Sequence, residues 1–176
     1  MGDVPSPVGH ALGGLIAGAS CLGASGRGRG AGAFLTAAAV AAIAPDFDFL
    51  WGRHSMETHS VAAAVLAGLA VLAWTRDRRL ALAVALAWAS HVLFDWLGSD
   101  TTPPIGVMAL WPFSSEFYFA NAYVFEAITR RYWLDNFVTH NAWAVLKETL
   151  MLGPVAWAAW WLARRRTSSG RNGGRW

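Results

Sequence analysis

Charged side chains and cysteines are scarce in this 176-residue sequence. Asp, Glu, Lys and Arg make up 14% of the chain and hydrophobic residues 55%. An ordinary soluble domain is roughly 25% charged. The single cysteine, Cys21, excludes a disulfide framework and a cysteine-based zinc site. The composition also excludes a disordered chain and argues against a nucleic-acid-binding domain. The length suits one domain.

Long uncharged runs stand where charges are missing: Val4–Gly26, Gly30–Pro45, Ser60–Thr75, Leu80–Phe94 and Thr149–Ala163. The first run is long enough for a membrane-spanning helix, which needs roughly 17–25 residues. The others reach that length only if polar helix ends are included. We therefore predict an all-α fold, a polytopic membrane helical bundle of about five helices. A soluble bundle of buried helices is the alternative. Within the first run, the spacings Gly9–Gly13 and Gly14–Gly18 are those of close helix packing.

The charged residues alternate in sign from one connection to the next. The connections around 27–29 and 76–79, together with the segment after 163, hold ten cations and one acid. The opposite side holds four cations and ten acids. Cytoplasmic loops of membrane proteins carry the excess of Lys and Arg. This pattern therefore predicts a multi-pass protein of the cell (inner or plasma) membrane, with its N-terminus outside and its C-terminus in the cytoplasm.

This topology divides the chain into a membrane-embedded domain and a tail. We expect residues 1–163 to form a single helical domain, in which residues 98–140 are a long extracytoplasmic connector before the last helix. Residues 164–176 are then a basic, disordered cytoplasmic tail, whose arginines attract anionic lipid headgroups. Membrane lipids are the expected partners, and nucleic acid is not.

Histidines and acidic residues gather on the predicted outer side. His91 and Asp95 are four residues apart, so on a helix they share one face. Asp46 and Asp48 flank a phenylalanine, which lets one carboxylate bind a metal while the other orients a histidine. The remaining candidates are His10, His54 and His59. Together these side chains form a nitrogen and oxygen ligand set that suits Zn²⁺ or Mn²⁺.

These residues also have ordinary interpretations. A carboxylate at a helix end commonly reaches water or stops the helix, and loop histidines are common at an interface. Glu148 shares a predicted helix face with Asn141 and has two possible roles. It is either an additional metal ligand or an ion-pair partner of a nearby cation, Arg130, Arg131 or Lys147.

Three stretches of the sequence resemble the YdjM family, whose members are described as inner-membrane-associated, metal-dependent hydrolases. They are Pro45-Asp46-Phe47-Asp48, His54-x-x-x-Thr58-His59-Ser60 and Ser90-His91-x-x-x-Asp95. The family also tends to carry a histidine near its start, which His10 would match. The sequence departs from the family at Ser55, where an arginine is expected; Arg53 is the candidate substitute.

A more distant similarity is to zinc-dependent phospholipase C and related nucleases, all-α proteins that cleave phosphoesters. Their order of ligands corresponds here to His10, Asp46, His59, His91 and Asp95. Their later His-x-x-x-Glu motif is missing, because Ala144 stands four residues after His140. Because that motif is missing, we expect one or two metal ions rather than the three that the similarity alone would imply.

Sequence and resemblance together predict a membrane-bound, metal-dependent hydrolase whose site opens at the extracytoplasmic face. The expected metal ligands are Asp46, His59, His91, Asp95 and His10. Asp48 or His54 is expected to act as the general base or to orient it. The metal, most simply Zn²⁺ and alternatively Mn²⁺, would activate water to attack an ester or phosphoester, such as that of a lipid. Two alternatives stay open: a transporter or metal-handling membrane protein, and a non-catalytic membrane protein with a structural metal site.

Overall fold

The computed structural model describes residues 5–22, 29–51, 54–100 and 103–169. Its helices are α1 (Pro7–Cys21), α2 (Arg29–Ile43), η2 (Ala44–Trp51), η3 (Glu57–His59), α3 (Val61–Thr75), α4 (Arg78–Leu97) and α5 (Phe137–Ser169), where η marks 3-10 helices. Within these ranges the only β-pairing is two isolated bridges. The predicted all-helical class with five α-helices is therefore confirmed.

Three helices begin where a polar side chain caps them, as short polar residues do at helix N-termini. The hydroxyl of Ser6 accepts a hydrogen bond from the Gly9 amide at the start of α1, at 3.1 Å. Ser60 does the same for α3, accepting from the Ala63 amide at 3.0 Å. Asp77 caps α4. These caps place the helix starts close to the first residues of the predicted uncharged runs.

Helix α5 is much longer than predicted, and two expected boundaries were wrong. It begins at Phe137, so the irregular connector after α4 ends at residue 136 and not at 140. It continues to Ser169, so the first part of the predicted disordered tail is helical, while residues 170–176 lie outside the described residues. The physical reason is that Lys147, Glu148 and Arg164 interrupt an apolar run, whereas charged side chains do not interrupt a helix.

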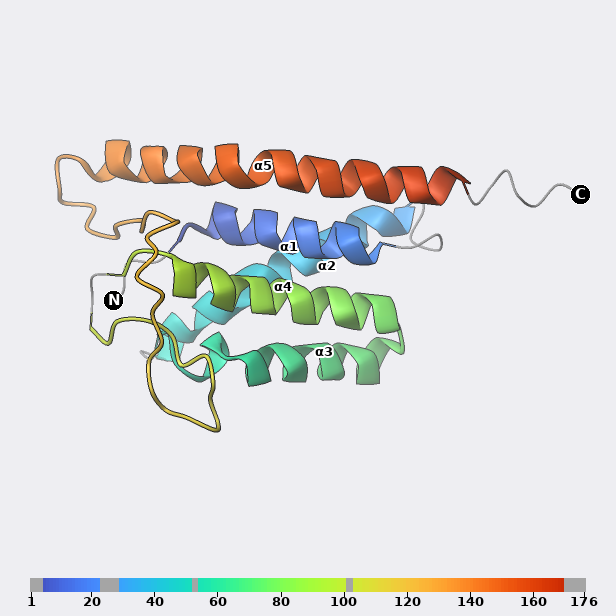
Figure 1. The fold of residues 1–176 in the computed structure, drawn as a ribbon, viewed down its shortest axis with the longest axis horizontal. Helices are drawn as coiled ribbons and strands as arrows, with labels where there is room; N and C mark the ends of the chain where they lie inside the picture. The colour runs from blue at the N-terminus through green and yellow to red at the C-terminus, as the bar shows by residue number, and fades with distance from the viewer. Residues whose placement is uncertain (1–4, 23–28, 52–53, 101–102, 170–176) are drawn as a thin grey trace, which may run out of the picture.

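Helix α1 is the centre of the bundle, in contact with α2, α4 and α5, and α3 packs on the other side of α4 (Figure 1). Glycines allow its close approach to α2. A Cβ atom at Gly14 would lie 2.5 Å from the Ala38 carbonyl oxygen, and one at Gly18 would lie 2.9 Å from the Ala38 Cβ. The close packing predicted from the Gly14–Gly18 spacing is confirmed.

The outside of the bundle is unusually apolar. Large hydrophobic side chains are exposed along α3, α4 and α5, among them Leu66, Leu69, Leu86, Leu150 and Trp157. Two helical segments are long and apolar enough to cross a membrane by length and composition, 30–50 and 78–97. The 15-residue α3 is also apolar but shorter.

The connector between α4 and α5 is irregular but attached to one end of the bundle, where α4 ends and α5 begins (Figure 1). The Val61 amide at the start of α3 donates to the Ala109 carbonyl at 3.0 Å. The Ser99 amide donates to the Phe125 carbonyl at 2.8 Å. The connector therefore covers the helix ends that carry the candidate site.

Candidate metal centre

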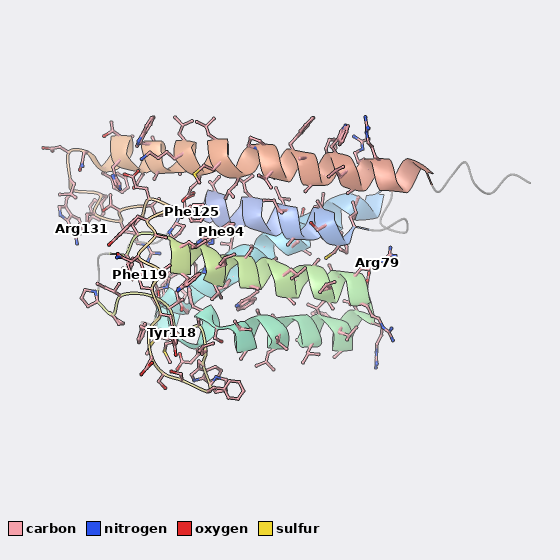
Figure 2. All side chains as sticks on the ribbon, viewed as in Figure 1. Arg79, Phe94, Tyr118, Phe119, Phe125 and Arg131 are labelled. Atoms are coloured by element: carbon pink, nitrogen blue, oxygen red, sulfur yellow. The ribbon has the colours of Figure 1, made fainter. Side chains whose placement is uncertain are left out.

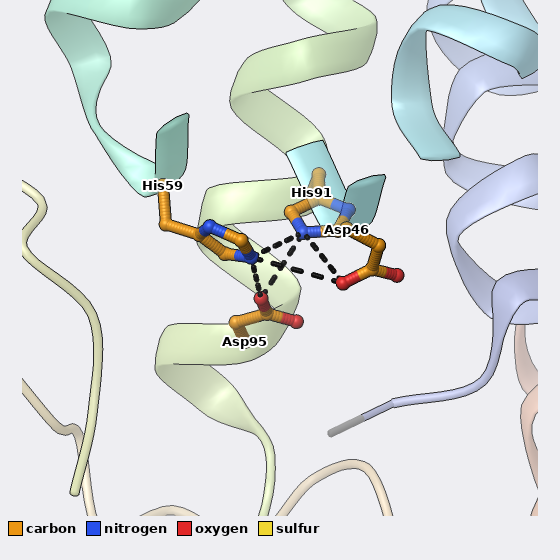
Figure 3. Close-up of side chains that lie close together, drawn as sticks. All are labelled: Asp46, His59, His91 and Asp95. Atoms are coloured by element: carbon orange, nitrogen blue, oxygen red, sulfur yellow. Dashed lines mark hydrogen bonds and ion pairs between the residues drawn. The ribbon is translucent and has the colours of Figure 1, made fainter. Parts of the chain in front are cut away.

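Four buried side chains meet at the end of the bundle that the connector covers (Figure 3). Asp46 comes from η2, directly after α2, and His59 ends η3. His91 and Asp95 lie one turn apart on α4, as their spacing predicted. Both histidines are completely buried, and Asp46 and Asp95 are at most 8% exposed. Side chains from three separate elements therefore meet at one buried position.

The facing atoms of these side chains lie close together. His59 Nε2 and His91 Nε2 are 3.0 Å apart, and Asp95 Oδ2 lies 3.2 Å and 3.1 Å from them. Asp46 Oδ1 lies 3.8 Å from His59 Nε2 and 3.6 Å from His91 Nε2. Four donors bound tetrahedrally to one zinc ion, each about 2.0–2.2 Å from it, would be about 3.3–3.6 Å apart. The observed separations fit such an ion.

The outer nitrogens of the two histidines show which way their lone pairs point. His91 Nδ1 lies 2.8 Å from the Ala42 carbonyl, which can only accept, so this nitrogen carries a hydrogen. His59 Nδ1 lies 3.1 Å from Asp48 Oδ2 and is likewise the donor. In the neutral imidazoles, both Nε2 lone pairs then face each other. Only a proton or a cation between them makes this arrangement favourable.

Carboxylate oxygens without hydrogen-bond partners also indicate a cation at this position. Within the described part of the chain, Asp46 Oδ1 and both carboxylate oxygens of Asp95 are buried without a hydrogen-bond partner. Buried polar atoms nearly always have one. A metal ion would satisfy these oxygens and offset the cost of burying two negative charges. The donor set therefore fits a divalent cation.

The protonation of His59 reflects these surroundings. Burial alone would lower its pKa, but the facing carboxylates of Asp46, Asp48 and Asp95 raise the pKa of His59 well above its usual value. In the absence of a metal, the imidazole therefore holds a proton that partly neutralises the three acids.

Asp48 and His54 lie beside the four-residue cluster and pair with each other. His54 Nδ1 lies 2.8 Å from Asp48 Oδ1, and Thr58 Oγ1 donates to Asp48 Oδ2 at 2.7 Å. His54 Nε2 is buried, has no hydrogen-bond partner among the described residues and lies 4.0 Å from Asp46 Oδ1. Asp48, His54 and His59 are also close enough together to hold an ion. Asp48 thus orients both histidines, and His54 directs a free nitrogen toward the cluster.

His10 approaches the cluster from the other side, on α1. Its Nε2 lies 3.3 Å from Asp95 Oδ1, the oxygen that faces away from His59 and His91, and its ring stacks on His91 with centroids 3.9 Å apart. Neither ring nitrogen has a hydrogen-bond partner within the described residues. The predicted position of His10 at the site is therefore observed, although it stands outside the four-residue cluster.

Glu148 has a partner that neither sequence interpretation included. Its carboxylate accepts hydrogen bonds from the Ser6 amide, at 2.8 Å, and from the Ser6 hydroxyl. It is 1% exposed and joins α5 to the N-terminus of α1. Lys147 pairs instead with Glu126, at 2.5 Å. The serine before Pro7 marks a helix cap in the sequence, but nothing in the sequence indicates its partner on α5.

Other contacts that hold the site were also missed. The Trp88 indole donates to the Thr58 carbonyl at 2.8 Å and ties η3 to α4. Ser55, where the family resemblance expected an arginine, has a left-handed backbone (φ 62°), and its carbonyl accepts from the Met108 amide. Arg53, the candidate substitute, lies outside the described residues.

Comparison with known protein families finds a match. A family model described as YdjM inner membrane protein matches residues 6–169. The chain belongs to the YdjM family. The match covers all three resemblance motifs and every described helix from end to end, so the YdjM resemblance is confirmed. No curated protein and no solved structure matches the chain. The YdjM description agrees with the apolar exterior and the two candidate spans.

Proposed function

We propose that this YdjM protein is a membrane-bound hydrolase that depends on a divalent metal, with zinc as the first candidate and manganese as the second. The observation that carries the proposal is the convergence of Asp46, His59, His91 and Asp95, with donor atoms buried and aimed at one point. A divalent ion there would lower the pKa of a water molecule and polarise an ester or phosphoester. Nitrogen and oxygen donors suit both candidate metals.

The residues beside the cluster supply the proton chemistry in this proposal. Asp48 accepts the Nδ1 hydrogen of His54, which leaves a lone pair on His54 Nε2. That nitrogen is buried close to Asp46 and accepts the proton of the attacking water as general base. Asp48 also holds His59 through Nδ1, so it acts as a positioning residue. His10 holds the second oxygen of Asp95.

We further propose a polytopic topology with the site at the extracytoplasmic face. Supporting it, the charge partition of the sequence amounts to about +9 on one side and −6 on the other, as expected from the positive-inside rule. Figure 2 shows Arg79 at the opposite end of the bundle from Tyr118, Phe119 and Arg131 of the connector. The connector is then extracytoplasmic, and lipids of the surrounding leaflet can reach the site.

A structural metal site is the second candidate function. It is favoured by the number of donors, because four protein ligands are typical of closed structural zinc sites, whereas catalytic sites leave a position open. Against it, Asp46 stands farther from the two histidines than Asp95 does, and His54 Nε2 faces the cluster unused. A transporter has less support, because the buried histidines and carboxylates of the described residues gather at one end of the bundle and do not continue to the other.

Substitution of His54 separates the two candidates. Purified wild-type protein, loaded with zinc, is assayed with bis-(p-nitrophenyl) phosphate, and its metal content is measured by mass spectrometry. His54→Gln should keep the metal and lose turnover by about 10²–10⁴-fold, the usual contribution of a general base. His140→Gln, in α5, is the matched control and should change neither quantity. Full turnover in His54→Gln would contradict the assigned base. A zinc-loaded wild type without turnover, but with higher thermal stability, would favour the structural site.

A further inference from the structure

Two apolar cavities meet beside the metal centre. The first has a volume of about 310 Å³ and lies between the end of α4, the start of α3 and the connector; Val92, Trp96 and Tyr118 line it. The second has a volume of about 580 Å³ and continues along α3 beneath Trp111 and Phe113. Both are lined by Val61, Ala109 and Leu110 as well. These volumes are typical of ligand pockets. We call the two cavities together the α3–α4 groove.

The groove begins next to the metal cluster. Val92 and Trp96 directly follow His91 and Asp95 on α4, and Val61 comes two residues after His59. Successive residues of a helix point in directions about 100° apart. Of the α4 residues that line the groove, Val92 is nearest in direction to Asp95, about 60° around the helix, whereas Leu93 and Trp96 lie farther round. The Val61–Ala109 hydrogen bond holds the connector against the start of α3, where it lines the groove.

The other end of the groove opens onto the apolar exterior of the bundle. Val65 and Leu66, which line it on α3, are 51% and 59% exposed, and Phe113 on the connector is 93% exposed. All the lining side chains of both cavities are aliphatic or aromatic. Water is a poor occupant of such a groove, since it needs polar partners. In a protein of an inner membrane family, hydrocarbon chains are the medium around this exterior.

We propose that the α3–α4 groove binds one acyl chain of a membrane phospholipid, whose headgroup phosphoester then lies at the metal cluster. The inference rests on the proposed hydrolase, because it assigns the substrate class of that site. It follows from adjacency: an apolar groove extends from the exposed side chains of Val65 and Leu66 to Val61, Val92 and Trp96. These last three residues stand one or two positions after His59, His91 and Asp95 in the chain. An amphiphile has this division between an apolar tail and a polar group that can reach a cation.

Photo-crosslinking in nanodiscs tests the groove without requiring turnover. The discs contain phosphatidylethanolamine and phosphatidylglycerol, with a small share of phosphatidylglycerol that carries a diazirine at one acyl terminus. The labelled residues of the full chain are mapped by mass spectrometry. Wild type and Asp95→Asn should both be labelled at the start of α3 and at 109–113 more strongly than at the exposed residues of α5. Labelling of the groove no stronger than that of α5 overturns the proposal, and so does crosslinking to a second protein chain there.

Filling the groove supplies the matched test. Ala62→Trp and Ala89→Trp each place an indole in one cavity. Each should lower groove labelling by roughly fivefold, the loss expected when one or two methylene groups leave an apolar wall. Ala156→Trp fills a similar cavity between α1, α2 and α5 and should leave groove labelling unchanged. Undiminished groove labelling in both filled variants overturns the proposal. Should a filled variant not fold, the wild-type map still decides.

Turnover then distinguishes this inference from the proposed function. If the groove is labelled as expected but no phosphodiester is cleaved by wild type, the hydrolase fails and the lipid site stands. If a water-soluble phosphodiester is cleaved while the groove is not labelled, the acyl site fails and the hydrolase stands. If both hold, the filled variants should lose turnover of long-chain phospholipid and keep turnover of the soluble substrate.

Discussion

His59 and His91 each use Nδ1 to hold an outside partner and direct Nε2 inward. The partner is Asp48 for His59 and the Ala42 carbonyl for His91. This arrangement fixes the tautomer of both rings and the direction of their lone pairs. At the scale of single residues, the outer partners therefore determine whether the inner atoms can bind a cation.

Asp48→Asn tests the role of an outer partner. The amide cannot accept hydrogens from His54, Thr58 and His59 as the carboxylate does, so both imidazoles lose their orientation. We expect zinc affinity to fall by about 10–100-fold, the usual effect of such a change, with the fold retained. Competition with a chromophoric chelator measures it. Asp77→Asn, which caps α4 at the opposite end, should bind zinc as wild type does, and equal affinity in both variants would contradict the assigned role.

The raised pKa of His59 predicts how zinc binding depends on pH. Below this pKa the imidazole is protonated, and only its neutral form binds a metal. Zinc must therefore displace one proton, so its affinity should fall as the pH falls, by about tenfold per pH unit. Above the pKa of His59 this dependence should disappear. Calorimetry in buffers of different ionisation enthalpy would show the released proton; binding at neutral pH without proton release would contradict the account.

The candidate site could be predicted from the sequence only where its geometry is local. The spacing of His91 and Asp95 gives a shared helix face without any knowledge of the fold. The contact of Glu148 with Ser6 joins residues 142 positions apart, and the Ala42 carbonyl that holds His91 is a backbone atom with no sequence signal. Those contacts depend on the packing of α1 against α5 and of α2 against α4.

At the scale of helices, glycines of α1 allow its neighbours to pack closely against it. Gly14 and Gly18 let α2 approach, and Gly9 leaves room for the Glu148 carboxylate, which would lie 2.6 Å from a Cβ atom there. Helix starts could be predicted from Ser6, Ser60 and Asp77, because capping is a local interaction. The start of α5 could not, because hydropathy marks where a helix turns apolar and not where it begins.

Gly14→Ala tests the close contact between α1 and α2. The added methyl group meets the backbone carbonyl of Ala38, which cannot rotate away, so the helices must separate. We expect the free energy of unfolding to fall by about 1–3 kcal/mol, as for other overpacked cores. Gly32→Ala is the matched control, because nothing lies within 4 Å of its added Cβ. Denaturation in detergent, followed by circular dichroism, compares the two; equal stabilities would contradict the packing.

At the scale of the whole molecule, charge and chemistry divide between the two ends of the bundle. The candidate site, the connector and Arg131 lie at one end, and Arg79 and the end of α5 at the other (Figures 1 and 2). The sum of charges, +3, hides this division. Its sign pattern could be read from the sequence because it depends only on the order of the segments.

A reporter fused after Trp176 tests the proposed topology. The basic C-terminal side should stay in the cytoplasm, so a fused fluorescent protein should fold there and a fused alkaline phosphatase should remain inactive. A second phosphatase inserted in the connector, after Tyr132, should be active. Activity of the C-terminal phosphatase would contradict the orientation and place the candidate site on the cytoplasmic side.

The metal content of the purified protein tests the central claim most directly. Wild type is loaded with zinc in detergent and dialysed, and the bound metal is counted by mass spectrometry. Asp95→Asn removes the carboxylate shared by His10, His59 and His91, whereas Glu148→Gln changes a buried carboxylate that hydrogen-bonds only Ser6 among the described residues. We predict at least one zinc ion per chain in wild type and Glu148→Gln, and none at this centre in Asp95→Asn. A wild type without metal, or an Asp95→Asn that binds as much as wild type, would contradict the account.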